Sequence, residues 1–114
     1  MFRNEQVLLH KKDGDVISYC VLSDRDVFQQ VKDVFTFPQF RGKGYAKALL
    51  SHIVKHARQP LYLICRSELQ SFYQSVGFSQ STDIPEYMAK RVQKVNVLIG
   101  RFLKRVHVVM ESGI

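Results

Sequence analysis

The sequence predicts a mixed α+β fold: a mostly antiparallel, twisted sheet with helices on both faces and a central β-α-β unit. Two observations predict it. Three apolar, strand-like segments come first, separated by short polar turns, which is the pattern of an antiparallel meander. A helix and a further short apolar strand follow, and a strand reached through a helical crossover pairs in parallel with the strand before it.

Length and composition indicate one globular domain over residues 1–114. The chain is 46% hydrophobic, with no apolar run near the roughly 20 residues that span a bilayer. Its first residues show no apolar signal segment, and Cys20 and Cys65 lie in apolar segments without metal-ligand spacing. We therefore expect buried, reduced thiols and a cytoplasmic protein, with a disulfide as the alternative.

The three N-terminal strands are predicted over residues 5–11, 16–22 and 27–37. An Asp-Gly pair between the first two supplies the positive φ angles of a tight hairpin. The middle strand, VISYCVL, is almost wholly apolar, which predicts a central strand covered on both faces. β-Branched and aromatic residues continue through the third strand until Pro38 ends it.

A basic glycine loop, Arg41-Gly42-Lys43-Gly44, follows the third strand and precedes a predicted helix. The helix is indicated by apolar residues at helical spacing: Tyr45, Ala46, Leu49, Leu50, Ile53, Val54 and Ala57. The glycines let the backbone turn and approach a ligand closely. The first helical amides lack intrahelical partners, and the helix dipole is positive at this end. The loop is therefore predicted to bind a phosphate or pyrophosphate.

Three further strands are predicted over residues 61–65, 78–81 and 106–111. A short helix is predicted between the first two, over residues 68–76, and Gly77 ends it in a left-handed conformation.

Two capping boxes are predicted to open the helices of this half. Ser67 with Gln70 opens the short helix, and Asp83 with Glu86 opens a longer one, with Pro85 in its first turn.

The longer helix is predicted over residues 85–104. Its apolar stripe consists of Met88, Val92, Val95, Ile99, Phe102 and Val106. Six cations and one anion fall between residues 86 and 105, so this segment carries a net +5 of the chain's +7. We interpret these charges as the solvated face of an amphipathic helix. The alternatives are that they bind an anionic acceptor, nucleic acid or a dimer partner.

Two motifs together resemble the GCN5-related N-acetyltransferase (GNAT) family. The segment Arg41-Gly42-Lys43-Gly44-Tyr45-Ala46 resembles the family's acetyl-CoA signature, (Q/R)-x-x-G-x-(G/A). The segment Phe72-Tyr73-Gln74-Ser75-Val76-Gly77-Phe78 resembles its later F-Y-x-x-x-G-F motif. The order of elements is similar from about Glu5 to Phe78, and the closing Val-Val-Met-Glu resembles common family endings.

The resemblance implies the acyl-CoA N-acyltransferase fold and transfer of an acetyl group from acetyl-CoA to a primary amine. It implies that backbone amides of the signature hold the pyrophosphate, which here are those of Arg41, Gly42, Lys43, Gly44, Tyr45 and Ala46. It also implies that the pantetheine arm bonds like an extra strand to Val34, Phe35 and Thr36, where a backbone N–H polarises the acetyl carbonyl. Tyr73 matches the tyrosine that protonates the leaving thiolate in many members.

Two departures from the family's pattern concern the base and the cofactor. Gln30 stands where some members have a glutamate base, so His10, Asp33 and Glu68 are alternative bases, beside a water chain or an amine that arrives neutral. Arg66 stands where the family often has an asparagine that contacts the cofactor, and it is the candidate for that contact.

A third departure concerns the acceptor side. The residues before Glu5 are too few for the family's first strand and two helices, which usually wall the acceptor site. The pocket for a small-molecule or peptide amine is therefore expected to be open, completed by a partner subunit in a homodimer, or rebuilt by the helix over residues 85–104.

Three functions stay open from the sequence: an acetyltransferase, a non-catalytic acyl-CoA-binding or regulatory module, and a small basic nucleic-acid-binding protein. The basic helix lacks interleaved aromatic residues and no RNA-binding motif is present, which argues against the last. His52 and His56 have the i, i+4 spacing of metal ligands, but no third ligand accompanies them, so no metal is expected. No membrane partner is expected either.

Overall fold

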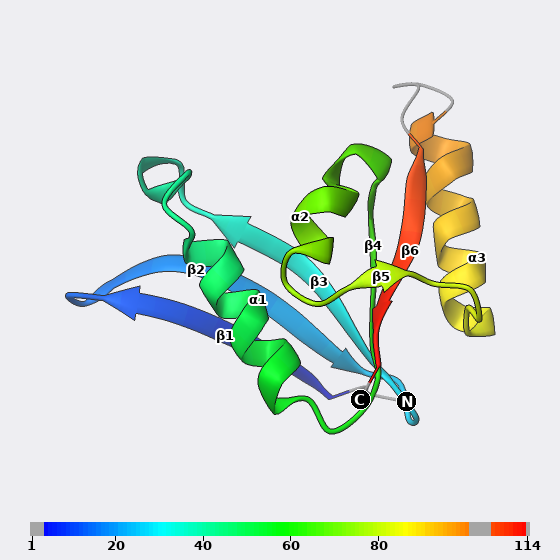
Figure 1. Ribbon diagram of the computed structural model, residues 1–114, viewed down its shortest axis with the longest axis horizontal. Helices are drawn as coiled ribbons and strands as arrows, with labels where there is room; N and C mark the ends of the chain where they lie inside the picture. Colours follow the sequence, from blue (N-terminus) through cyan, green and yellow to red (C-terminus); the bar gives the residue numbers. More distant parts are fainter. Residues whose placement is uncertain (1–3, 101–105, 114) are drawn as a thin grey trace. The chain divides into compact units, whose positions relative to one another are not determined.

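A computed structural model describes residues 4–100 and 106–113. Within these residues the chain forms six strands and three α-helices (Figure 1), so the predicted mixed α+β class is confirmed. The elements group into two compact units, residues 1–61 with 113–114 and residues 62–112. The predicted single domain, and the parallel pairing that would join the third strand to the fourth, stay predictions.

The first unit contains the antiparallel meander expected from the sequence. It consists of β1 (Glu5–Lys12), β2 (Asp15–Asp24) and β3 (Gln29–Thr36), and β2 pairs with both neighbours. The hairpin between β1 and β2 turns at Asp13 and Gly14, with φ angles of 53° and 84°. Two consecutive left-handed residues form the kind of turn that suits a tight hairpin, as the Asp-Gly pair predicts.

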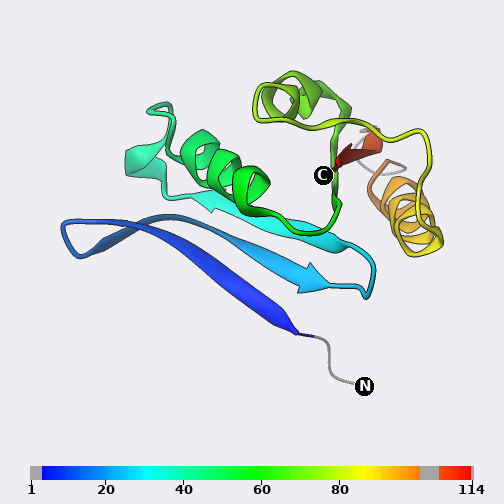
Figure 2. The same cartoon turned by 60° about the horizontal axis from the view of Figure 1, so that its bottom comes forward.

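Helix α1 (Tyr45–His56) lies along one face of these three strands, as Figure 2 shows. A short 3-10 turn, η1 (Pro38–Phe40), leads from β3 toward it. The buried core of this unit comes from both layers: Ile17, Cys20, Leu22, Val31, Leu49, Leu50 and Ile53. Each buried aliphatic side chain contributes about 1.5–3 kcal/mol. Packing of one helical face on the meander therefore holds α1 against the sheet.

The second unit contains β4 (Leu61–Arg66), β5 (Ser79–Gln80) and β6 (His107–Ser112). In the strand order β6 lies between β4 and β5, and it pairs antiparallel with β5. Helix α3 (Glu86–Val95) lies beside β6 (Figure 1), and its Met88 is fully buried. The three strands predicted for this half are thus confirmed, with boundaries shifted by one or two residues.

Both predicted capping boxes are wrong. The segment after β4 is a 3-10 turn, η2 (Ser67–Leu69), followed by a five-residue helix, α2 (Gln70–Gln74), and neither has a side-chain cap. The Ser67 N–H donates to the Val106 carbonyl at 2.8 Å, and the Gln70 amide donates to the Gln80 side chain at 3.3 Å. The polar groups that would form the box therefore have other partners.

The second box fails for a different reason. Helix α3 has no side-chain cap, and Pro85 is its N-cap rather than a residue of its first turn. Glu86, the first helical residue, forms an ion pair with Lys90 at 3.1 Å instead of reaching back toward Asp83. The predicted left-handed end of the preceding helix is confirmed, since Gly77 has a φ of 107°.

The long C-terminal helix changes its geometry at Asn96. Beyond Val95 the chain continues as a π-helical turn, η3 (Asn96–Gly100), which the regular stripe did not predict. The side chain of Ile99 and all of Phe102 lie outside the described residues. Val106 directly precedes β6 and is exposed, so its assignment to the helical stripe is wrong.

Cys20 and Cys65 are both buried free thiols, as predicted, and burial raises the pKa of each to about 11. We expect both to resist iodoacetamide at pH 8 in the folded protein, because the thiolate is the reactive form. Mass spectrometry should show two modifications only after denaturation. Between the ordinary pKa and about 11 the unfolded chain loses these protons and the folded chain keeps them, so stability should fall as the pH rises through this window. Rapid labelling of either thiol in the native state would contradict this expectation.

Across the described part of the chain, no helix is long and apolar enough to cross a membrane. The cytoplasmic location stays a prediction.

Candidate cofactor site

The glycine loop between η1 and α1 has the backbone conformation that the sequence predicts. Gly42 and Gly44 both have left-handed φ angles, 77° and 83°. A Cβ atom built on either glycine would meet no other atom within 4 Å, so the backbone angle, and not crowding, is what requires glycine there. Gly44 is the N-cap of α1 and has no side chain to cap the helix. The first amides of α1 therefore face the loop without intrahelical partners, which suits an anion.

The side chain of Arg41 ties this loop to the end of β3. Its Nε donates to the Thr36 carbonyl at 2.9 Å, and its guanidinium lies 5.3 Å from the centre of the Phe35 ring. The structure thus brings together two segments predicted to bind the same ligand, the strand Val34–Thr36 and the signature loop. The sequence did not indicate this anchoring role. Contact of Arg41 with a phosphate stays a prediction, and it would use the remaining guanidinium donors.

A β-bulge in β3 overlaps the start of the segment predicted to bind pantetheine. The register between β2 and β3 shifts between Tyr19 and Val21, and Asp33 has a left-handed φ of 55°. One extra residue on β3 changes the direction in which the following residues point. This bulge was not predicted from the sequence. Its signal was the aspartate, one of the few residues besides glycine that adopt this conformation in a strand.

Two buried hydroxyl groups lie next to each other beyond the bulge. Ser18 on β2 is the register partner of Thr36 on β3, which places their side chains on the same face. Neither hydroxyl oxygen has a hydrogen-bond partner among the described residues. Buried polar atoms usually find one, so this pair marks a place where a polar ligand group could bind. The loop amides and these hydroxyls fit a phosphate-bearing ligand with a polar arm.

Tyr45, the first residue of α1, packs between two rings of the first unit. His10 on β1 meets it edge-on with ring centres 5.2 Å apart, and Phe40 does so at 6.1 Å. These contacts fix the start of the helix against β1 and η1. They also place His10, one of the alternative bases, beside the signature.

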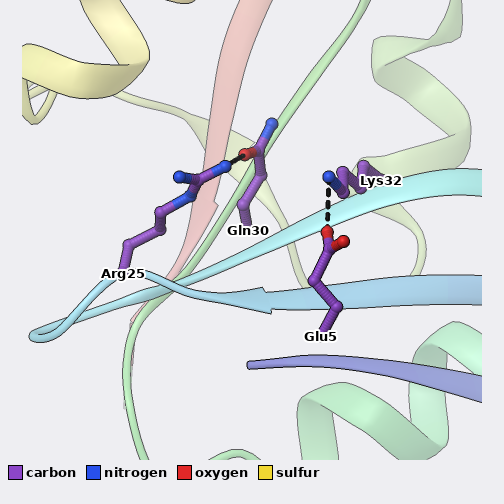
Figure 3. A network of polar contacts seen from close by, with 4 residues as sticks. All are labelled: Glu5, Arg25, Gln30 and Lys32. Carbon is purple, nitrogen blue, oxygen red and sulfur yellow. Dashed lines mark hydrogen bonds and ion pairs between the residues drawn. The ribbon is translucent and has the colours of Figure 1, made fainter. Parts of the chain in front are cut away.

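Gln30, which replaces the family's glutamate base, is buried in β3, with only 6% of its surface exposed. Arg25 donates to its Oε1 at 3.4 Å (Figure 3). On the same strand Lys32 forms an ion pair with Glu5 of β1 at 2.6 Å. The Lys32 hydrogen bond and charge hold the pKa of the Glu5 carboxyl below its ordinary value. Position 30 therefore holds a neutral group whose acceptor oxygen already has a partner.

Tyr73 lies on α2 in the second unit and is 9% exposed. Its ring meets Phe72 at 5.1 Å and Phe78 at 6.0 Å, and its carbonyl accepts a hydrogen bond from the Phe78 N–H at 3.0 Å. Gly77 allows the chain to reverse so that Phe78 returns to this position. The F-Y-x-x-x-G-F segment thus builds a small aromatic cluster that holds Tyr73. Its catalytic role stays a prediction.

The other candidates are more exposed. Arg66, at the end of β4, forms a 3.6 Å ion pair with Glu68, and the two side chains are 36% and 56% exposed. Asp33 is exposed at the bulge. Within the described residues no group of three or more potential metal ligands comes together.

A family model described as an acetyltransferase (GNAT) domain matches residues 3–80. The chain belongs to the GNAT family. The match covers the meander, the signature loop, α1 and the segment around Tyr73. No curated protein matches the sequence.

Solved structures show the same GNAT fold. Escherichia coli ElaA is 22% identical with a TM-score of 0.67, over 95% of this chain and 68% of its own. Two others were solved with the cofactor. A putative streptothricin acetyltransferase from Bacillus anthracis, in complex with acetyl coenzyme A, is 16% identical with a TM-score of 0.71, over 97% of this chain and 63% of its own. N-acetylglutamate synthase from Neisseria gonorrhoeae, complexed with coenzyme A and N-acetyl-glutamate, is 16% identical with a TM-score of 0.70, over 94% of this chain and 25% of its own. At these identities the likeness shows the fold, and the predicted acyl-CoA N-acyltransferase fold is confirmed.

Proposed function

We propose that this GNAT protein is an acetyl-CoA-dependent N-acetyltransferase that acts on a primary amine. The observation that carries the proposal is the loop Arg41–Ala46, with two left-handed glycines in open space at the start of α1. Backbone amides arranged in this way bind phosphate groups. The acetyl-CoA and coenzyme A bound to solved GNAT structures support the same assignment.

Each predicted residue has a role in this proposal. The amides from Arg41 to Ala46 hold the pyrophosphate, while the backbone of Val34, Phe35 and Thr36 bonds the pantetheine arm. The amine nitrogen attacks the thioester carbonyl, the carbon–sulfur bond breaks, and Tyr73 donates a proton to the leaving thiolate. The nitrogen loses one proton as the amide forms.

The proton from the amine needs an acceptor other than residue 30. A glutamine has no basic site at neutral pH, and the Oε1 of Gln30 accepts a hydrogen bond from Arg25. We propose that water takes this proton, which predicts that activity rises with pH as more of the amine becomes neutral. The alternative bases remain His10, Asp33 and Glu68. Arg66 remains the candidate for a contact with the cofactor.

The same observation favours a second candidate function, a module that binds acyl-CoA without turnover. The two functions differ in one measurement, the release of the coenzyme A thiol in the presence of a panel of primary amines. Binding of acetyl-CoA without thiol release on any amine of the panel would favour the module.

Replacing Gly44 by alanine should weaken acetyl-CoA binding at least tenfold in calorimetric titration. The reason is that a left-handed φ costs an alanine about 1–2 kcal/mol, so the loop relaxes and its amides turn away from the pyrophosphate. Wild-type protein should bind acetyl-CoA and coenzyme A with similar affinity, since both carry the pyrophosphate.

Gly14→Ala is the matched control. Gly14 has a φ of 84° and equally open surroundings, but it lies in the hairpin turn between β1 and β2. Both variants should lose similar stability, and only Gly44→Ala should lose affinity. Equal affinity in all three proteins, or no heat with the wild type at millimolar ligand, would overturn the cofactor assignment.

A further inference from the structure

Strand β1 leaves one edge of the first unit's sheet open. It is eight residues long and pairs with β2 on one side; none of the other described strands of this unit pairs with it. Its outward-facing backbone groups are therefore free to bond a further strand. Two large apolar side chains on it are exposed, Val7 at 63% and Leu9 at 47%. An edge strand of this length with exposed apolar side chains is a site for pairing with another chain.

We propose that two copies of this chain associate through antiparallel pairing of their β1 strands. The partner is identified by the sequence of the strand itself, EQVLLHKK, which is complementary to its own reverse. In a symmetric pair, a two-fold axis perpendicular to the sheet passes between Leu8 and the partner's Leu8. Each residue then faces a partner residue at the same distance from Leu8 in the opposite direction along the sequence.

This register matches charge with charge and apolar with apolar groups. Glu5 lies opposite the partner's Lys11, and Val7 lies opposite the partner's Leu9. Each pair occurs twice because of the symmetry. Residues 5, 7, 9 and 11 share one face of the strand, so all four pairs lie side by side on the face away from α1. Lys32 already pairs with Glu5 on this face, which confirms where the Glu5 side chain points.

The other face of β1 supports the same register. Leu8 meets the partner's Leu8 there, and Gln6 meets the partner's His10. On this side two hollows lie between β1 and α1, of about 590 Å³ and about 370 Å³, lined in part by Leu8 and by His10. A strand added to β1 would extend the floor of both hollows and supply side chains to cover them.

A competing explanation is that the lysines near the end of β1 protect a free edge, as edge lysines often do. Sedimentation velocity without acetyl-CoA separates the two. We expect the wild type to dimerise, and Glu5→Lys and Lys11→Glu each to weaken the dimer about tenfold or more, since each places like charges opposite one another twice. An equimolar mixture of the two variants should dimerise again. In the mixed dimer, a lysine at position 5 or 11 of one copy always lies opposite a glutamate of the other, so both opposite-charge pairs are restored.

Lys12→Glu is the matched control. It makes the same charge change one residue along the strand, where the register places the partner's neutral Asn4 opposite. It should leave the dimer within about twofold of the wild type, so an effect of net charge alone is excluded.

Cross-linking tests the register directly. Leu8→Cys places two thiols across the axis at the spacing of directly opposed residues, about 4.5–5.5 Å between Cβ atoms, and should form a disulfide-linked dimer on oxidation. Gln6→Cys, on the same face, places its thiols about 13 Å apart along the strands and should not. A wild type that stays monomeric at every concentration would overturn the proposal, as would a dimer that ignores the charge variants and fails to cross-link at residue 8. Because no cofactor or acceptor is involved, either failure is separate from that of the proposed acetyltransferase activity.

Discussion

Replacing Tyr73 by phenylalanine is expected to lower kcat for acetyl transfer about a hundredfold and to leave the affinity for acetyl-CoA unchanged. The substitution removes only the hydroxyl group, and the ring keeps its contacts with Phe72 and Phe78. Loss of a positioned general acid costs on the order of 10²–10⁴ in rate. The measurement is thiol release with a panel of primary amines, beside a calorimetric titration with acetyl-CoA.

Tyr87→Phe on α3 is the control, since it also removes a tyrosine hydroxyl group but lies outside the F-Y-x-x-x-G-F segment. It should leave both kcat and affinity within about twofold of the wild type. Equal turnover by wild type and Tyr73→Phe would refute the acid role. A parallel loss of affinity and turnover would instead indicate that the hydroxyl holds the cofactor.

The strands and the first helix were predictable because their burial repeats along the sequence. The middle strand of the meander is almost wholly apolar and follows an Asp-Gly turn, and α1 repeats apolar residues at helical spacing. These patterns indicate which side of a strand or helix is buried. They can be recognised in the sequence even when the packing partner is unknown.

Helix ends were less predictable because they depend on partners remote in the sequence. Ser67 fits a capping box by local spacing, but its N–H bonds to Val106, far along the chain. The π-helical turn at Asn96 is similar, since the Asn96 side chain forms two hydrogen bonds with the backbone of His107. Local propensity cannot show such competition.

The candidate site also has features that the sequence predicted and features that it did not. The left-handed backbone at the two glycines of the signature was predictable, because few other residues adopt this conformation. The position of the Arg41 side chain was not predictable, since Phe35 and the Thr36 carbonyl become its partners only once β3 and the loop have folded. The bulge at Asp33 was visible only as an aspartate inside an apolar strand.

Replacing Asn96 by alanine is expected to lower the free energy of unfolding by about 2 kcal/mol. Its side-chain amide donates to the His107 carbonyl at 3.0 Å, and its side-chain oxygen, Oδ1, accepts from the His107 N–H at 2.7 Å. One side chain thus satisfies both backbone groups at the first residue of β6, in a partly buried place. Leaving a buried donor and acceptor unpaired costs about 1 kcal/mol or more for each.

Asn96→Asp and Gln93→Ala sharpen this measurement. The aspartate keeps the acceptor for the His107 N–H but loses the donor to its carbonyl, so its loss in chemical denaturation should fall between those of wild type and Asn96→Ala. Gln93 is exposed one turn earlier on α3, and its replacement should change stability by less than about 0.5 kcal/mol. If Asn96→Ala proved no more destabilising than Gln93→Ala, the two hydrogen bonds would not hold the end of α3 to β6.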